Sequence, residues 1–118
     1  MIKGIGIDII ELERIGDSIK KSERLAERVL TMKEMECYHN KGSDRRRVEY
    51  LAGRFASKEA CSKALGTGIG ALSFQDIEVL NDENGAPIIK VVGYEDYSIF
   101  LSISHSEAYA VAQVVIED

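Results

Sequence analysis

The first half of the chain begins with alternating apolar residues and then changes to a helical period. The opening run MIKGIGIDII places isoleucines at alternate positions, which predicts a strand that ends near Asp8. From Glu11 to about Asn40 the apolar positions follow a helical period, which predicts two or three helices. Thr31 precedes Glu34 by three residues, as in a capping box, so one of these helices is expected to begin there.

A long helix and a group of strands make up the rest of the pattern. The helix is predicted from about Arg45 to Leu65, with Ser43 or Asp44 as its N-cap and Gly66 as the residue that ends it. Beyond the GTGIG loop, four segments read as strands, with the turn NDENGAP between the first two: FQDIEVL, PIIKVV, IFLSISHS and YAVAQVVIE. This order predicts an α+β fold with a mostly antiparallel, meander-like C-terminal part, in a single domain of residues 1–118.

Length and composition narrow the class of protein. A chain of 118 residues with 45% hydrophobic and 30% charged residues is typical of one globular domain. No apolar run approaches the ~18–20 residues that cross a bilayer, and no secretory signal is evident. Cys37 and Cys61 form no recognisable metal or redox motif, which favours a reducing compartment. We therefore expect a cytoplasmic protein with no membrane partner.

The net charge of −5 is unevenly distributed. Residues 1–65 carry fourteen basic and eleven acidic side chains, whereas residues 66–118 carry one and nine. An acidic protein is a poor non-specific binder of nucleic acid, because such binding neutralises many phosphates. The basic first half instead indicates a local anionic ligand or partner, although solvated helices would give the same asymmetry.

One strip of the long helix combines charged and small residues. At about 100° per residue, the strip consists of Ala52, Ala56, Glu59 and Lys63. The i,i+4 spacing of Glu59 and Lys63 is compatible with a surface ion pair. The alanines favour a second interpretation, in which a ligand lies along the helix. Arg54 and Lys58 form another i,i+4 pair on a different strip, so only a long, folded ligand could reach both pairs.

Asp8 is the most unusual polar residue of the opening strand. A carboxylate after an apolar strand is costly to bury without a partner. It could cap a helix that starts near Ile10. Alternatively, Asp8 and Glu59 could form a two-carboxylate metal site, which suits Mg²⁺ because this ion retains waters and takes further ligands from substrate phosphates.

Three other features are less specific. GTGIG follows a helix and lacks the Gly-Lys-Ser/Thr ending of a P-loop, so taken alone it is a helix terminator and flexible turn. His105 in SISHSEAY has no acid or nucleophile placed with it, which leaves it as a turn residue. The run Arg45, Arg46 and Arg47 is compatible with a solvated helix start. However, its positive charge opposes the helix dipole, which favours a bound anion.

With these residues in view, the whole chain resembles the holo-acyl-carrier-protein synthases, the small bacterial 4′-phosphopantetheinyl transferases. GIGIDIIELERI resembles the opening motif of the family and GRFASKEACSKALGTGIG its central signature. LSFQDIEV, SISHSEAYAVAQVVIE and the length agree as well, and the departures at Ile10 and Cys61 touch no charged position. The resemblance implies the fold of that family. It also implies transfer of the 4′-phosphopantetheine group of coenzyme A to a serine of apo acyl carrier protein, with release of 3′,5′-ADP, in fatty acid biosynthesis.

The resemblance also implies roles for individual residues. Asp8 and Glu59 would bind Mg²⁺ together with pyrophosphate oxygens of coenzyme A, and Lys63 would contact a phosphate oxygen and stabilise charge. The alanines of the long helix would leave space for the folded coenzyme. The serine proton would go to Glu59 or to a metal-bound water. The positions that match the family's 3′-phosphate contacts are Arg46, Arg54 and His105.

Two kinds of protein partner are implied as well. The family forms homotrimers with active sites at subunit interfaces, and the four C-terminal strands would supply the apolar face. Acyl carrier protein is acidic, and a basic face is expected to dock it, although a solvated face is the simpler alternative. The four residues recur at i, i+7, i+10 and i+14 and would share one face if the helix is continuous: Arg14, Lys21, Arg24 and Arg28.

Two other functions are compatible with parts of the pattern. A non-catalytic module that binds coenzyme A or a nucleotide would keep the pocket without turnover, although the presence of Asp8, Glu59 and Lys63 argues against it. A metal-dependent phosphohydrolase would also use two carboxylates, and it would cleave coenzyme A without needing a carrier protein.

Overall fold

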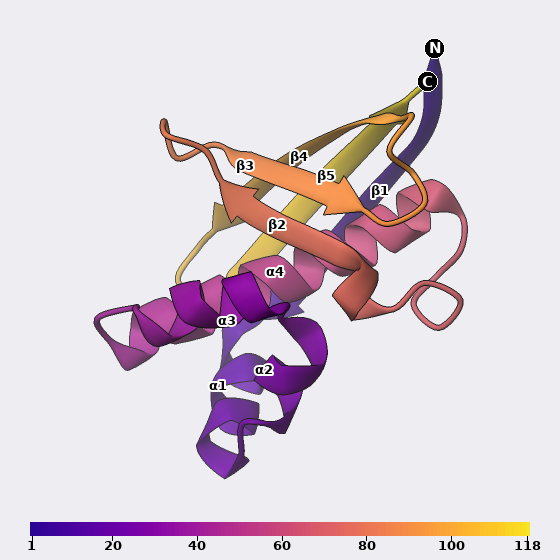
Figure 1. The fold of residues 1–118 in the computed structure, drawn as a ribbon. Helices are drawn as coiled ribbons and strands as arrows, with labels where there is room; N and C mark the ends of the chain where they lie inside the picture. The colour runs from indigo at the N-terminus through magenta and orange to yellow at the C-terminus, as the bar shows by residue number, and fades with distance from the viewer.

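The computed structural model of the protein describes all residues, 1–118, and contains one strand, four helices and then four strands (Figure 1). The elements are β1 (Ile2–Glu11), α1 (Leu12–Lys21), α2 (Arg24–Val29), α3 (Met32–His39), α4 (Asp44–Leu65), the 3₁₀ turn η1 (Phe74–Asp76), β2 (Ile77–Asn81), β3 (Pro87–Val91), β4 (Ser98–His105) and β5 (Tyr109–Glu117). The predicted α+β class is confirmed, and of the two or three helices predicted before the long one the structure has three.

The strands form two separate antiparallel sheets. One sheet has the order β1-β5-β4, with β5 in the centre, and the other is the β2–β3 hairpin. The predicted antiparallel pairing is confirmed, but the meander of four successive strands is wrong. Because β1 pairs with β5 along its whole length, the first and last strands become neighbours, and both termini lie side by side (Figure 1).

Strand β1 is longer than the sequence predicts. Ile9 and Ile10 continue the pairing opposite Val111 and Ala110, and the strand ends at Glu11 rather than near Asp8. The interpretation of Asp8 as a helix N-cap is therefore wrong. It lies within the strand.

The predicted helix ends are confirmed where the signals are local. The Thr31 hydroxyl accepts a hydrogen bond from the Glu34 N–H (3.4 Å), and the Glu34 carboxylate accepts one from the Thr31 N–H (2.8 Å). Ser43 caps α4 by accepting from the Arg46 N–H (3.2 Å). Gly66 ends α4 in the left-handed conformation (φ 77°), which glycine adopts without strain. None of the helices has the length and apolar character of a membrane span.

Helix α4 packs across one face of the three-stranded sheet, with the β2–β3 hairpin on its other side (Figure 1). Ala52, Ala56 and Ala60 have no exposed surface. The prediction that the alanines leave room for a ligand is therefore wrong, because the protein's own core covers them.

The small residues of α4 instead allow an unusually close approach by β1. A Cβ atom added to Gly4 would lie 1.9 Å from the Ala64 carbonyl oxygen, and one added to Gly6 would lie 1.9 Å from the Ala60 oxygen. Both distances are far below van der Waals contact, so only glycine fits at these two strand positions.

We expect Gly6→Ala to destabilise the fold by about 3 kcal/mol or more, because a clash with backbone cannot be relieved by a side-chain rotation. Urea unfolding would measure the loss. Gly42→Ala is the control, since an added Cβ there meets nothing within 4 Å, and its effect should stay within about 0.5 kcal/mol. A Gly6→Ala protein as stable as the wild type would contradict the close packing of β1 on α4.

Candidate functional site

The close packing of β1 on α4 brings Asp8 and Lys63 together, fifty-five residues apart in sequence. The Lys63 ammonium donates hydrogen bonds to the Asp8 carboxylate (3.0 Å) and to the Ile7 carbonyl (3.0 Å). Lys63 thus pairs with Asp8 rather than with Glu59, so the i,i+4 ion pair considered from the sequence is not formed. The lysine side chain is half exposed, which leaves the ammonium able to meet a ligand.

The charges of Asp8 and Lys63 both act on the Glu59 carboxyl. Burial raises the pKa of the Glu59 carboxyl, and the negative charge of Asp8 raises it further. The positive charges of Lys63 and Arg28 lower it in part. Asp8, Glu59 and Lys63, which the sequence analysis selected independently, therefore form one cluster at the junction of β1 and α4.

The donor set of this cluster fits a hard divalent cation. Asp8 and Glu59 supply carboxylate oxygens, the ligands that Mg²⁺ prefers, and a cation between them would relieve the repulsion that raises the pKa of Glu59. No group of three or more potential metal-ligating side chains occurs anywhere in the chain. The sequence prediction of Asp8 and Glu59 as two protein ligands is compatible with this arrangement, in which further ligands would come from a substrate or from water.

The glycine loop that follows α4 folds back onto the end of the helix. The N–H groups of Thr67 and Gly68 donate to the Ser62 carbonyl (3.1 and 3.3 Å). Gly66, Gly68 and Gly70 all have positive φ, which explains the spacing of the glycines. The hydroxyl oxygen of Thr67 is buried without a hydrogen-bond partner, so the loop holds an unpaired polar atom.

A second group of predicted residues lies near the start of α4. The Nε2–H of His105, at the end of β4, donates to the Glu49 carbonyl (3.1 Å); this tautomer follows because a carbonyl can only accept. An added Cβ at Gly53 would lie 3.3 Å from His105 Nε2, so the helix glycine lets the imidazole ring lie against the helix. The side chain of Arg46 is exposed and has no partner within the protein.

Arg45 fixes the position of this second group. Its guanidinium donates to the carbonyls of Ser106 (3.3 Å) and Glu107 (2.9 Å) and pairs with Glu49. The arginine therefore ties the β4–β5 turn to the start of α4. Of the three consecutive arginines, Arg46 is the one left free to meet an anion.

Arg54 and Lys58 are interior residues rather than a surface pair. Arg54 is 7% exposed. Its guanidinium donates to the Val79 carbonyl (3.4 Å) and to the side-chain oxygen of Asn81 (2.6 Å). The guanidinium carbon lies 4.2 Å from the centroid of the Tyr50 ring. Within the single chain, a phosphate contact would require Arg54 to leave these partners. Lys58 is fully buried, which the sequence analysis missed because its spacing from Arg54 resembled an exposed pair.

The two groups of predicted residues are well separated on one chain. Arg46 and Glu59 are thirteen residues apart on α4, which corresponds to roughly 20 Å along a helix. The structure therefore brings Asp8, Glu59 and Lys63 together, but it does not bring Arg46 or His105 to them.

The predicted docking residues are all exposed, but they do not share one helix. Lys21 ends α1 and Arg24 begins α2, with Ser22 between them in an extended conformation (φ −172°, ψ 171°). The condition for a single basic face, a continuous helix from Arg14 to Arg28, is therefore not met. Of the four docking residues, Arg28 is the one whose charge lowers the pKa of Glu59. Its guanidinium carbon lies 5.4 Å from the centroid of the Phe74 ring.

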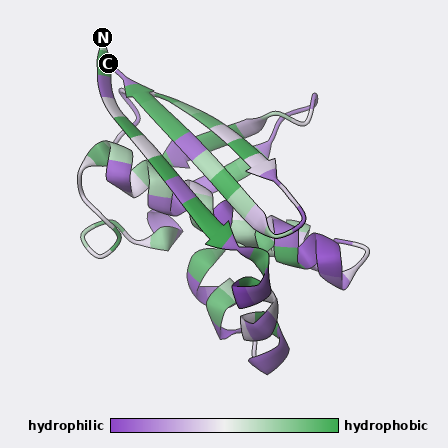
Figure 2. Cartoon of the chain, turned by 180° about the vertical axis from the view of Figure 1, so that it is seen from behind, coloured by the Kyte–Doolittle hydropathy of each residue, from purple (hydrophilic) through white to green (hydrophobic).

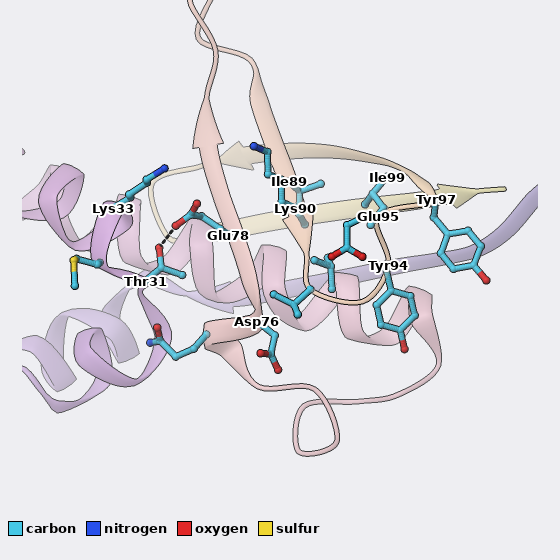
Figure 3. Close-up of a pocket in the computed structure, with 14 residues that line it drawn as sticks. Thr31, Lys33, Asp76, Glu78, Ile89, Lys90, Tyr94, Glu95, Tyr97 and Ile99 are labelled. Atoms are coloured by element: carbon cyan, nitrogen blue, oxygen red, sulfur yellow. Dashed lines mark hydrogen bonds between the residues drawn. The ribbon is translucent and has the colours of Figure 1, made fainter.

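A groove of about 780 Å³ lies elsewhere, between α3 and the β2–β3 hairpin (Figure 3). Its walls carry the hydrogen-bonded pair Thr31 and Glu78 together with Tyr94 and Tyr97. None of the predicted site residues lines this groove. The carboxylate cluster lies outside this groove, with Lys63 half exposed and the Asp8 side chain 18% exposed.

Comparison with known proteins places this arrangement in a family. The family model described as the 4′-phosphopantetheinyl transferase superfamily matches residues 4–114. The holo-[acyl-carrier-protein] synthase of Oceanobacillus iheyensis is 56% identical over 117 residues, covering 99% of this chain and 98% of the relative. The corresponding enzyme of Bacillus subtilis is 52% identical over 118 residues, covering 99% and 97%.

Solved structures of holo-(acyl-carrier-protein) synthases are similar to this fold over nearly the whole chain. The holo-(acyl-carrier-protein) synthase of Bacillus anthracis, in complex with CoA (3′,5′-ADP), has a TM-score of 0.90 and 53% identity, covering 100% of this chain and 98% of that one. The Helicobacter pylori enzyme in complex with coenzyme A has a TM-score of 0.84 and 38% identity, covering 96% and 99%. The chain therefore belongs to the 4′-phosphopantetheinyl transferase superfamily and, within it, to the holo-[acyl-carrier-protein] synthases.

We expect Gly53→Ala to displace the His105 ring, because the new methyl group would press on Nε2 and on Ile103 (3.4 Å). Loss of the bond to Glu49 would make the imidazole tautomers of His105 more nearly equal in ¹⁵N NMR spectra, whereas His39 should be unaffected. Gly16→Ala, where the added Cβ meets only Val48 at 3.7 Å, is the matched helix control. Unchanged His105 signals in Gly53→Ala would contradict the role of this glycine.

Proposed function

We propose that the chain transfers the 4′-phosphopantetheine group of coenzyme A to a serine of apo acyl carrier protein. The products are holo acyl carrier protein and 3′,5′-ADP, and the reaction serves fatty acid biosynthesis. The observation that carries the proposal is the cluster of Asp8, Lys63 and Glu59 at the junction of β1 and α4. It occurs in a chain that matches holo-[acyl-carrier-protein] synthases over nearly its full length.

Asp8 and Glu59 would hold Mg²⁺ in this cluster. When bound, the ion would neutralise charge on the pyrophosphate, which lowers the barrier to attack by an anionic or developing anionic oxygen. The proposal is supported by the donor chemistry of the two carboxylates and by the pKa of Glu59, which burial and then the charge of Asp8 raise.

Lys63 would stabilise charge on the transferring phosphoryl group. In the reaction a bond forms between the serine oxygen and the phosphorus of the phosphopantetheine, while the bond from that phosphorus to the bridging oxygen of 3′,5′-ADP breaks. The leaving oxygen gains negative charge, and the half-exposed ammonium of Lys63 lies at the site to meet it. The serine supplies the nucleophile, so the enzyme needs no activated nucleophile of its own.

Glu59 is the candidate acceptor of the serine proton among the residues of this chain. A carboxyl whose pKa is raised by burial is a better base at neutral pH than an ordinary one. A cation held by Glu59 would lower this basicity, so a water molecule at the cation is the alternative acceptor of the proton.

The 3′-phosphate of coenzyme A would be bound by Arg46 and His105. Arg46 is exposed and unpaired, and His105 is fixed against α4 with its Nδ1 edge free. Arg54 would join them only after leaving its interior partners. The roughly 20 Å along α4 between Arg46 and Glu59 supports a site completed by Arg46 and His105 of a second protomer.

Assembly into a homotrimer would close this gap. The sheet face that does not pack on α4 exposes large apolar side chains: Ile5 (59%), Ile7 (58%), Ile9 (63%) and Phe100 (55%). Figure 2 looks onto this side and shows hydrophobic positions along the strands. An apolar face of this kind on a folded chain is typical of a protein interface. The face belongs to β1, β5 and β4, and not to the four C-terminal strands together.

Apo acyl carrier protein would dock against α1 and α2. The exposed cations there are complementary to an acidic partner, and the charge of one of them, Arg28 on α2, reaches the Glu59 carboxyl. The contributing residues would be Arg14, Lys21, Arg24 and Arg28. The two free cysteines fit the reducing cytoplasm, where we propose that the protein works.

Transfer would be tested by incubating the protein with apo acyl carrier protein, coenzyme A and Mg²⁺ and weighing the carrier by intact mass spectrometry. We expect the carrier to gain the mass of one phosphopantetheine arm. Asp8→Asn and Glu59→Gln should slow the gain by about a hundredfold or more, comparable to the loss of one charge-stabilising group. Glu83→Gln, an exposed carboxylate in the β2–β3 turn, should leave the rate unchanged.

Other outcomes of the same assay would contradict transfer in distinct ways. Bound coenzyme A with no mass gain would support the non-catalytic binding module. Cleavage of coenzyme A with an unmodified carrier would support the phosphohydrolase.

Assembly would be tested with Ile7→Lys, which places a charge on the apolar sheet face. We expect this variant to elute as a monomer in size-exclusion chromatography with light scattering, and to lose transfer because the second protomer's cations are absent. Val92→Lys, a substitution of an exposed apolar residue outside this face, should leave the trimer intact. A monomeric wild type, or a trimeric and active Ile7→Lys variant, would count against the homotrimer.

A further inference from the structure

A buried lysine occupies the point where four elements of the structure meet. The ammonium of Lys58 has no exposed surface and donates to the Glu34 carboxylate (2.6 Å), the Val29 carbonyl (2.6 Å) and the Phe74 carbonyl (3.1 Å). A lysine has three N–H donors, so every one of them is used. Helices α2, α3 and α4 and the turn η1 are joined through this single group.

Glu34 completes the network on the acidic side. It has no exposed surface, and the oxygen that binds Lys58 also accepts from the Thr31 N–H (2.8 Å). The other oxygen accepts from the Val79 N–H in β2 (2.7 Å). The carboxylate therefore ties the start of α3 to β2 while it neutralises the lysine.

Stability alone does not account for such a pair. Removing two charges from water costs about as much as their attraction returns, and well-packed apolar residues often replace buried ion pairs without loss. What an ion pair supplies in addition is direction, because each hydrogen bond fixes a distance and an angle. The hydrogen bonds of this pair therefore hold one part of the molecule in a defined position.

The part that is fixed is the end of α2. This helix has six residues, too few to keep a position by itself, and Val29 is its last residue. The Gln75 side chain amide holds the same end from outside by donating to the carbonyls of Glu27 (3.1 Å), Arg28 (3.2 Å) and Leu30 (2.7 Å). Every carbonyl from residue 27 to residue 30 is thus held by Lys58 or by Gln75.

The geometry of α2 matters because of Arg28. This residue directly precedes Val29, as Lys58 directly precedes Glu59, and the charge of Arg28 reaches the Glu59 carboxyl. The tie between Lys58 and Val29 therefore sets where a docking cation lies relative to the reaction site.

We propose that Lys58, together with Glu34, is a positioning residue that holds α2 so that Arg28 meets the acyl carrier protein beside Glu59. The proposal rests on the proposed function, because it assigns the docking of the carrier to the surface that includes Arg28. Lys58 itself touches neither substrate. Its loss should raise KM for the carrier protein and leave KM for coenzyme A unchanged.

The test compares steady-state kinetics of the wild type with the double variant Lys58→Met/Glu34→Gln. Methionine matches the length of lysine without its charge, and glutamine keeps one acceptor for the backbone N–H groups. We expect KM for the carrier to rise about tenfold, equivalent to about 1.4 kcal/mol, while KM for coenzyme A and kcat change by less than about twofold. Amide hydrogen exchange should become faster in α2 and remain slow in α4.

Two further variants separate positioning from general stability. Cys61→Ala changes a fully buried side chain of α4 outside the network, so it should lower the melting temperature and leave both KM values unchanged. Arg28→Ala should raise KM for the carrier, and adding it to the double variant should raise KM no further, because both changes remove the same contact.

If Lys58→Met/Glu34→Gln does not fold, Gln75→Leu loosens α2 from its exposed side without touching the buried charges. We expect it to produce a smaller rise in KM for the carrier alone.

The outcomes that overturn the proposal are specific. A fall in kcat in proportion to lost folded protein, with unchanged KM values, would mean that Lys58 only stabilises the fold. Fully additive effects of Arg28→Ala and the double variant would mean that the pair does not act through Arg28. If the wild type fails to transfer at all, the proposed function fails by itself, and unchanged hydrogen exchange of α2 in the double variant would still reject the positioning role.

Discussion

The contact between strand β1 and helix α4 is the constraint on which the site depends. Gly4 and Gly6 lie against the backbone of Ala60 and Ala64 so closely that any side chain on the strand would collide with it. Because this contact fixes both the distance and the register of β1, Asp8 reaches Lys63 across fifty-five residues of sequence. A strand that sat farther from the helix would leave the two carboxylates on separate surfaces.

The two sides of α4 carry polar side chains with different surroundings. On the open side of α4, Asp8, Glu59 and Lys63 remain partly exposed, where a cation and a pyrophosphate can reach them. On the buried side, Lys58 is satisfied entirely by protein groups and links the short helices to α4. Neighbouring residues of one helix thus serve ligand chemistry and internal geometry, because successive positions point in different directions.

Some features could be predicted because they depend on neighbours in sequence. Thr31 and Glu34 form their capping box within one turn, and Gly66 ends α4 because its own φ is positive. The carboxylate cluster was accessible because the two segments that resemble family motifs contain Asp8, Glu59 and Lys63. Fold class followed from the order of patterns along the chain, and the comparisons support it over the full length.

Other features depend on contacts that spacing does not encode. Small residues on a helix are compatible with either a ligand or a close strand, and only the structure shows that β1 packs on Ala60 and Ala64 and that Ala56 is buried. The break between α1 and α2 at Ser22 lacks a glycine or proline, so a continuous basic face seemed consistent with the sequence. The burial of Lys58 could not be recognised, because its partner Glu34 lies on another helix.

The central claim is that β1 and α4 build one cation site, and paramagnetic NMR tests it most directly. Mn²⁺ would be titrated into the ¹⁵N-labelled protein with 3′,5′-ADP present, and line broadening would be followed residue by residue. The account predicts that broadening begins at the amides around Asp8 and around Glu59 at the same Mn²⁺ concentration. Broadening confined to the acidic turn at Asp82 and Glu83, or to only one of the two elements, would contradict it.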